Sequence, residues 1–98
     1  MKYAYEFIGT FFLVATIGMV VVAPGAAALG FAPLAIGTVL AVMVFAGGHV
    51  SGGHYNPLVT LALLMQGKTD RTDTIYYILF QMVGALFAGF AAAFLLQC

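Results

Sequence analysis

The most constraining feature of this sequence is a long central stretch without charge. Between Glu6 and Lys68 the chain contains no Asp, Glu, Lys or Arg. A helix that crosses the hydrocarbon core of a bilayer needs about 20 mostly apolar residues. The uncharged stretch is long enough for more than one such crossing. We therefore expect an all-α integral membrane protein in which residues 1–98 form a single membrane domain.

The composition agrees with a membrane protein and excludes several other classes. The chain is 64% hydrophobic and 6% charged, far from the balance of soluble domains. Its formal net charge is zero, so it has no basic stripe for nucleic acid. The single cysteine, Cys98, can form neither an internal disulfide nor a metal cluster. We expect membrane lipids around the chain, no nucleic-acid partner, no cofactor and no metal.

The first apolar run, about residues 2–22, predicts a first membrane helix. It stops at Pro24-Gly25, a dipeptide that ends helices. A secretory signal peptide is the alternative, because small residues near a cleavage site follow the run. The apolar stretch from Phe7 to Ala23 is longer than a typical signal core, however, and only Lys2 precedes it as a basic residue. A membrane helix therefore fits better.

The second and third helices are expected at about residues 31–48 and 74–96. The two runs are separated by a glycine-rich segment and then by Lys68 to Asp73, which carries four of the six charges and must lie in water. Each glycine costs a helix roughly 1 kcal/mol relative to alanine. Because four glycines follow one another closely from Gly47, we expect irregular backbone there and a re-entrant loop over residues 49–56.

A half-length helix is expected after this loop, over residues 57–66. Asn56 is a preferred N-cap and Pro57 is preferred at the first helical position. Gly67 and Lys68 are typical of a helix end. About ten residues cover roughly 15 Å, half of the hydrocarbon core, so this helix enters the membrane without crossing it. Irregular backbone facing lipid is not tolerated, so the loop must be covered by protein or line a water-filled cavity.

The residues from His49 to Ala62, H-V-S-G-G-H-Y-N-P-L-V-T-L-A, resemble the first Asn-Pro-Ala loop of the aquaporin and glycerol-facilitator family. The segment from Glu6 to Phe11 resembles the first-helix signature of that family, and the segment from Tyr77 to Ala85 resembles its third helix. Family members consist of two inverted repeats, each of three helices and one half-helix. This sequence resembles one repeat, which implies that an inverted second copy completes the fold.

The chemistry of the motif can be argued from its residues. The side-chain oxygen of Asn56 is expected to cap the half-helix, which leaves the amide NH₂ free to donate to a passing water. The positive end of the half-helix near mid-membrane opposes cations, including the proton. The selectivity motif is accordingly expected at Asn56, Pro57 and Leu58, and pore-lining carbonyls at Gly52, Gly53 and His54.

Three further side chains are candidates to support the loop. The resemblance implies that Glu6 braces the loop backbone, whereas on physical grounds it also has the option of reaching the membrane interface. Gln81 has the same supporting role by resemblance, with an ordinary interhelical hydrogen bond as its alternative. His49 is expected to pack against the loop. His49 and His54 have no third ligand nearby, so we expect no metal site.

Two candidate filter positions follow from the resemblance. Val59 stands two residues past the proline, where the second motif of the family carries an arginine. Ile36 matches the place where water channels of the family tend to have an aromatic residue. Aliphatic residues at both positions predict a pore that admits solutes somewhat larger or less polar than water.

We expect a passive channel for water and small uncharged solutes such as glycerol or ammonia. A pore needs a complete wall, and the simplest one is a homodimer with one copy inverted about a two-fold axis in the membrane plane. By resemblance to the tetramers of the family, the full particle contains eight copies. We expect no enzyme, because no nucleophile, base and orienting group are discernible together.

Two alternatives stay open at this point. Lys2, Lys68 and Arg71 are expected on one side of the membrane, a bias that opposes insertion in both orientations. A heteromeric pore, in which a different subunit supplies the inverted half, accommodates that bias. The other alternative is a small dual-topology exporter that uses Glu6 as its coupling carboxylate.

Overall fold

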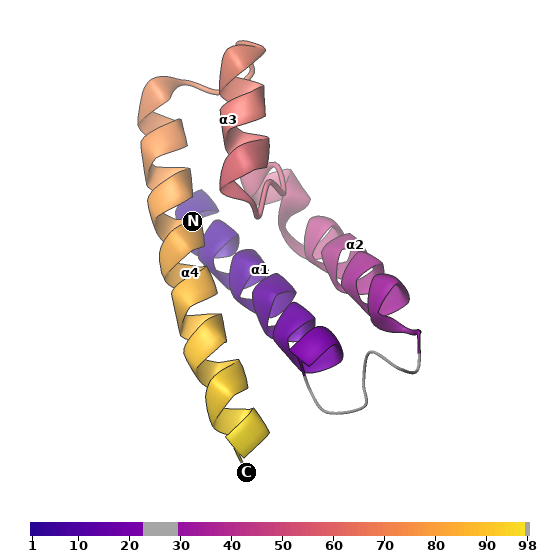
Figure 1. Cartoon of the computed structure of the whole chain (residues 1–98). Helices are drawn as coiled ribbons and strands as arrows, with labels where there is room; N and C mark the ends of the chain where they lie inside the picture. Colours follow the sequence, from indigo (N-terminus) through magenta and orange to yellow (C-terminus); the bar gives the residue numbers. More distant parts are fainter. Residues whose placement is uncertain (23–29, 98) are drawn as a thin grey trace.

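The chain folds into a small bundle of helices with one interruption (Figure 1). The computed structural model describes residues 1–22 and 30–97, so the expected turn at Pro24-Gly25 and the terminal Cys98 lie outside the described residues. Within them, three helices are long and apolar enough to cross a membrane: Lys2–Val21, Ala32–Ser51 and Arg71–Gln97. The all-helical membrane architecture expected from the sequence is confirmed.

The first span consists of α1 (Lys2–Ile17) and a π-helical continuation, η1 (Gly18–Val22). Gly18 stands where α1 approaches the last span, because a Cβ atom built on it would lie 2.9 Å from the Cβ atom of Ala92. The absence of a side chain at this position allows the two helices to pack closely.

The second span, α2 (Ala32–Ser51), is longer than the sequence indicated. The expected end at residue 48 and the expected irregular backbone from Gly47 are wrong, since His49 to Ser51 are helical. The prediction from helix propensity fails here because Gly47 makes room for neighbouring side chains and does not interrupt the helix. A Cβ atom at Gly47 would lie 2.7 Å from Tyr5 and from the Tyr55 hydroxyl oxygen. The helix ends instead at Gly52, whose φ of 90° is a left-handed C-cap.

The half-length helix α3 (Pro57–Met65) begins at its expected residue and ends one residue earlier than expected. Gly67 adopts a φ of 74°. Its N–H donates to the Leu64 carbonyl, and the Lys68 N–H donates to the Leu63 carbonyl. This pair of hydrogen bonds is a Schellman motif, which satisfies the last carbonyls of the helix. At about 1.5 Å per residue, its nine residues span roughly 14 Å.

The third span, α4 (Arg71–Gln97), begins three residues before its expected start. Asp70 explains the earlier start, because its carboxylate accepts a hydrogen bond of 2.7 Å from the Asp73 backbone N–H. The Asp70 backbone carbonyl accepts another from the Thr74 N–H at 3.0 Å. A side-chain oxygen that receives a first-turn N–H is the usual N-cap of a helix.

The helix α1 lies between α2 and α4, and α3 runs beside the first part of α4 (Figure 1). The helices α1 and α4 begin on the same side of the bundle. Lys2 Nζ lies 2.7 Å from an Asp73 carboxylate oxygen, and the Tyr3 hydroxyl donates to the other oxygen at 2.7 Å. Lys68 and Arg71 lie at the end of α3 and the start of α4. The three basic residues are therefore grouped at one end of the bundle.

The interior of the bundle contains many polar side chains, beside tyrosines and small residues. The buried polar side chains among the described residues are those of Glu6, Thr10, Ser51, Thr60, Thr74 and Gln81. Large apolar side chains are exposed along every α-helix, and among the most exposed are Phe45 on α2 and Met65 on α3, both at 88%. In a bilayer lipid replaces water around such side chains, so the apolar surface is stable and the polar groups must find partners inside.

Candidate functional site

The loop between α2 and α3 is a short chain of unusual backbone conformations. Gly52 and Gly53 adopt φ angles of 90° and 70°, which glycine accepts readily because it has no Cβ atom. Tyr55 adopts a φ of 56°, an uncommon angle for a residue with a side chain. A backbone of this kind persists only where surrounding contacts hold it in place.

The Glu6 carboxylate supplies most of these contacts. Its Oε2 atom accepts hydrogen bonds from the Ser51 hydroxyl at 2.6 Å and from the His54 backbone N–H at 3.2 Å. Its Oε1 atom accepts from the Tyr55 backbone N–H and from Gln81 Nε2, both at 2.8 Å. Glu6 is fully buried, so it does not reach the membrane interface. The structure thus places Glu6 and Gln81 directly behind the loop.

A second set of contacts joins the loop to α3 and α4. Gln81 Nε2 also donates to Thr60 Oγ1 at 3.0 Å. The same hydroxyl lies 3.0 Å from His54 Nδ1, and the His54 ring packs against Tyr77 at 4.8 Å between ring centres. The Tyr77 hydroxyl donates to the Ser51 carbonyl at the end of α2. The loop is therefore tied to all three spans and to the half-helix.

Sequence reasoning missed Tyr55, which is 1% exposed. Its hydroxyl donates to the Met43 carbonyl at 2.6 Å. Its ring fills the space beside two glycines, since a Cβ atom at Gly9 would lie 2.1 Å from the ring and one at Gly47 would lie 2.7 Å from its hydroxyl oxygen. No local pattern marks this pairing, because Gly9 is far from Tyr55 in sequence and Gly47, although nearer, lies on α2.

Thr60 and Ser51 were also missed, although a general signal was available. A hydroxyl in an apolar membrane helix must find a hydrogen-bond partner. Thr60 stands one helical turn after Asn56 and is fully buried. That position directs its hydroxyl to the polar groups behind the loop.

Asn56 has the geometry expected of a cap. Its backbone is extended, with φ of −157° and ψ of 127°, and its Oδ1 atom accepts a hydrogen bond from the Leu58 N–H at 2.9 Å. The side chain is exposed. Among the described residues its amide nitrogen has no hydrogen-bond partner, which leaves both amide hydrogens available. Pro57 is the first residue of α3, and Leu58 is 73% exposed.

The three residues expected to line the pore with their carbonyl groups are adjacent to this cap. Gly52, Gly53 and His54 occupy the loop between the end of α2 and Asn56. Within residues 1–22 and 30–97, none of their carbonyl oxygens accepts a hydrogen bond. These oxygens therefore keep their acceptor capacity for a mobile ligand.

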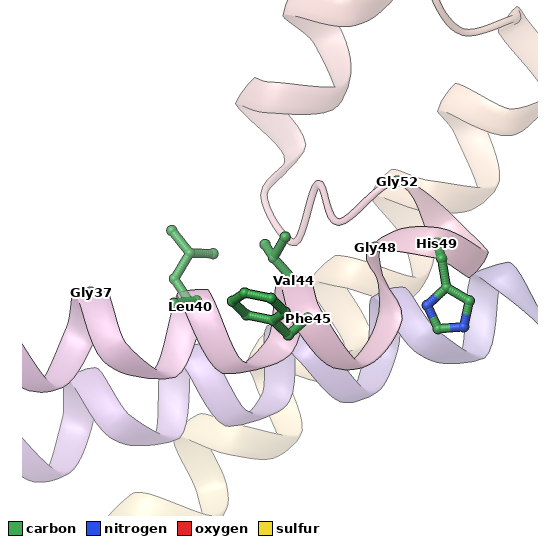
Figure 2. Close-up of a pocket in the computed structure, with 8 residues that line it drawn as sticks. Gly37, Leu40, Val44, Phe45, Gly48, His49 and Gly52 are labelled. Carbon is green, nitrogen blue, oxygen red and sulfur yellow. The ribbon is translucent and has the colours of Figure 1, made fainter.

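The remaining expected site residues do not join the network. His49 was expected to support the loop, and this expectation is wrong, because it is exposed on α2, where it lines an outer groove (Figure 2). Helical backbone at His49 directs it away from the loop. Ile36 lies in the first half of α2 and is half-buried, and Val59 lies in the first turn of α3 and is 42% exposed. No group of three potential metal ligands occurs in the described part of the chain.

Comparison with known proteins identifies the family of this arrangement. The model of the Major intrinsic protein family matches residues 1–97. Glycerol uptake facilitator protein-like 6 of Lactiplantibacillus plantarum is 42% identical over 92 residues, which cover 92% of this chain and 41% of that protein. Aquaporin Z of Photorhabdus laumondii subsp. laumondii is 40% identical over 92 residues, covering 89% of this chain and 40% of the relative.

A second aquaporin Z, that of Bradyrhizobium diazoefficiens, is 39% identical over 92 residues, covering 89% of this chain and 38% of that protein. The chain thus spans about two fifths of the length of these curated relatives. Major intrinsic proteins are membrane channels and not enzymes. With three candidate spans and a half-length helix in the order of one family repeat, this chain is a multi-pass integral membrane protein that belongs to the Major intrinsic protein family.

Proposed function

We propose that the chain forms a passive channel for water and small uncharged solutes. The observation that carries this proposal is Asn56, an exposed cap at the start of a half-length helix within a bundle of membrane spans. Its oxygen is used by the cap, so its amide hydrogens are the groups it presents outward. The names of the relatives, a glycerol uptake facilitator and two aquaporins, support the same class of solute.

The mechanism follows from fixed donors and acceptors. A solute at the loop meets the Asn56 amide as donor and the free carbonyls of Gly52, Gly53 and His54 as acceptors. These groups replace part of its hydration as it passes. The positive end of α3 repels cations, including hydronium. Because the contacts behind the loop are made by Glu6 and Gln81, the groups in front need no rearrangement when a solute arrives.

The wall of this pore requires a second repeat. Gly52 and Asn56 are exposed, and lipid cannot satisfy the polar groups of the loop. We propose that an inverted second copy supplies the missing wall, related by a two-fold axis in the membrane plane. Such an axis brings two Asn56 caps together near the midplane. The minimal conducting unit then contains two copies, and four such units make a particle of eight.

Selectivity is proposed to depend on Ile36 and Val59. Both are aliphatic and offer no hydrogen bonds to a solute that has lost water. A homodimer carries each of them twice and contains no arginine at the corresponding positions. Water is then expected to pass more slowly than in a strict water channel, while glycerol and ammonia gain entry. Narrowing variants, Ile36→Phe and Val59→Arg, should reduce the flux of glycerol more than the flux of water.

A heteromeric pore is the second candidate, and the charge distribution favours it. The basic residues Lys2, Lys68 and Arg71 are grouped at one end of the bundle. This charge asymmetry favours insertion of the chain into the membrane in a single orientation. A partner of opposite bias then supplies the inverted half. The exporter alternative has no such support, because the Glu6 carboxylate is fully buried and all of its acceptor sites are occupied by four donors.

The experiment that tests the proposal is osmotic shrinkage of vesicles that contain only this chain. Water, glycerol and ammonia fluxes are measured by stopped-flow light scattering against empty vesicles. We expect flux above the empty control for all three solutes, independent of any proton gradient. Fluxes equal to those of empty vesicles would contradict a homomeric channel, and recovery of flux only with an added partner repeat would favour the heteromeric pore.

A further inference from the structure

The carboxylate of Glu6 is a full negative charge enclosed within the membrane bundle. Its side chain is fully buried. The one ion pair within residues 1–22 and 30–97 joins Lys2 to Asp73, so no basic side chain in this part of the chain is paired with Glu6. A charge buried in a membrane protein without an opposite charge beside it is costly, and such residues usually serve a function.

Hydrogen bonds surround this charge without neutralising it. The donors are the Ser51 hydroxyl, the backbone N–H groups of His54 and Tyr55, and the side-chain amide of Gln81. All of these donors are neutral groups. An ionised carboxylate accepts at about four positions, so the donors fill its capacity for hydrogen bonds. Glu6 therefore keeps its negative charge behind the loop although its hydrogen bonds are complete.

The start of α3 carries charge of the opposite sign. The first turn of a helix is equivalent to roughly half a positive charge, and here that turn follows the exposed cap Asn56. The electrostatic potential at any one point has a single sign, so a positive potential that repels a cation attracts an anion. Helix N-termini are accordingly common anion-binding sites in proteins. The start of α3 alone would therefore oppose sodium or hydronium and favour the entry of chloride.

We propose that the negative charge of Glu6 is what keeps anions out of the pore. Its Oε1 atom accepts from the N–H of Tyr55, the residue immediately before the Asn56 cap, so the charge lies close behind the start of α3. From there it offsets the positive potential of the helix at the loop. The inference rests on the proposed channel and adds a residue that determines selectivity between neutral solutes and anions.

The positions of the two charges suit such an offset. Asn56, at the start of α3, is exposed, whereas Glu6 is fully buried and so lies farther from a passing ion. Coulomb energy falls with distance, so a full charge at the greater distance balances about half a charge nearby. An ion of either sign then receives no compensation for the water that it loses, whereas a neutral solute needs only the hydrogen bonds that the loop offers.

The contacts of Glu6 also orient two peptide groups of the loop. In a planar trans peptide the carbonyl and the following N–H point in opposite directions. Because the N–H groups of His54 and Tyr55 point toward Glu6, the carbonyls of Gly53 and His54 point away from it. Glu6 thus has a geometric effect through its hydrogen bonds and an electrostatic effect through its charge. Only the electrostatic effect distinguishes an anion from a cation, so a test has to change the charge and the contacts separately.

The test measures three fluxes in vesicles that contain only this chain. Water flux is followed by light scattering. Chloride entry is followed by quenching of an entrapped fluorescent dye, with valinomycin and potassium present so that charge does not accumulate. Sodium entry is followed with an entrapped sodium-sensitive dye. The wild type should pass water and exclude both chloride and sodium.

Two variants remove the net charge by different routes. Glu6→Gln removes the charge itself and keeps the size and one acceptor. Gln81→Lys keeps Glu6 and adds an ammonium group where Gln81 Nε2 donates to Glu6 and Thr60, so the charge is neutralised while donors remain. Each variant should raise chloride entry relative to water flux by about tenfold or more and leave sodium excluded. Gln81→Met, which loses the same hydrogen bonds without adding charge, is the matched control and should exclude chloride as the wild type does.

Three results would overturn the role of Glu6. The first is chloride exclusion by a Gln81→Lys variant that still conducts water. The second is equal chloride entry in Gln81→Lys and Gln81→Met, which would trace the leak to lost contacts. The third is a parallel rise of sodium and chloride entry, which would indicate a damaged wall. If Glu6→Gln does not fold, the two Gln81 variants decide the question. Absence of water flux in the wild type contradicts the channel itself, whereas water flux with unchanged chloride exclusion in the variants contradicts only this inference.

Discussion

Two glycines on α2, Gly37 and Gly47, have opposite surroundings. At Gly47 the space a side chain would occupy is already filled by Tyr5 and Tyr55, at 2.7 Å. At Gly37 the same space is open. Both residues lower helix propensity by a similar amount, so propensity does not distinguish them. Gly47 serves packing inside the repeat, whereas Gly37 belongs to the outer surface of α2.

The contrast extends to the two sides of the bundle. Behind the loop, each oxygen of the Glu6 carboxylate accepts two hydrogen bonds, and the hydroxyl and amide groups that donate them belong to this chain. On the outer face of α2 the exposed groups are apolar or small. Polar groups in a membrane need hydrogen-bond partners within the protein, whereas an apolar surface is stable in contact with lipid. The interior behind the loop is therefore polar and closely connected by hydrogen bonds, whereas the outer face of α2 is apolar.

The largest effect should come from removing the carboxylate behind the loop. Glu6→Ala leaves four donors without an acceptor in a region that water does not replace. We expect the free energy of unfolding in mild detergent to fall by roughly 3–5 kcal/mol, the scale for removing one member of a buried charged contact. Solute flux should be lost with it. Glu6→Gln, which keeps the size and one acceptor, should lose less. Wild-type stability of Glu6→Ala would show that the loop is held by other contacts.

The two glycines can be compared directly by the same substitution. Gly47→Leu should lower the free energy of unfolding by roughly 1–3 kcal/mol, because the added side chain meets a packed interior. Gly37→Leu should leave it unchanged or raise it by under about 1 kcal/mol through better helix propensity. The measurement is unfolding at detergent concentrations that separate individual copies. Equal losses at both positions would remove the distinction between an inner and an outer face of α2.

A smaller effect is expected at the hydroxyl of Tyr55. Tyr55→Phe keeps the ring beside Gly9 and removes only the hydrogen bond to the Met43 carbonyl. We expect a loss of about 1 kcal/mol in the free energy of unfolding. Tyr76→Phe is the matched control, since Tyr76 is 44% exposed on α4 and its hydroxyl has no hydrogen bond among the described residues. A Tyr55→Phe variant as stable as the control would mean that packing of the ring alone positions the loop.

The smallest effect on stability, and the most specific effect on conduction, should come from Asn56→Asp. Aspartate caps a helix as well as asparagine does, so the free energy of unfolding should change by less than about 0.5 kcal/mol. The substitution replaces the outward donor by a negative charge. Vesicles that contain the variant should therefore admit cations that the wild type excludes. Unchanged water flux together with unchanged cation exclusion would argue against a selectivity role for Asn56.

The parts of the fold that the sequence predicted correctly are governed by local or one-dimensional rules. Bilayer thickness sets the length of an apolar span, so the three spans were visible as uncharged runs. The cap at Asn56 and the end of α3 at Gly67 depend on neighbouring residues only. Their bounds agree with the structure within a few residues. The resemblance added the placement of Glu6 and Gln81 behind the loop, which spacing alone does not reveal.

The failures share a different cause. The sequence placed the end of α2 too early because Gly47 and Gly48 count as helix breakers unless their packing is known. His49 was assigned to the loop for the same reason, and three additional helical residues carry it to the outer groove. Tyr55 and Thr60 were overlooked because their partners lie on other helices.

The sequence by itself therefore determined that lipid surrounds this protein, the number and approximate length of its described spans, and the position of the half-helix, because hydropathy and capping are short-range properties. Only the tertiary structure decided which glycines are packed and which are open, and that one carboxylate holds the loop from behind. It also decided that the outer face of α2 carries an exposed Phe45 and an open Gly37, one turn on either side of Ala41. These properties depend on side chains brought together from distant parts of the chain, and their distances are set by the packing of whole helices.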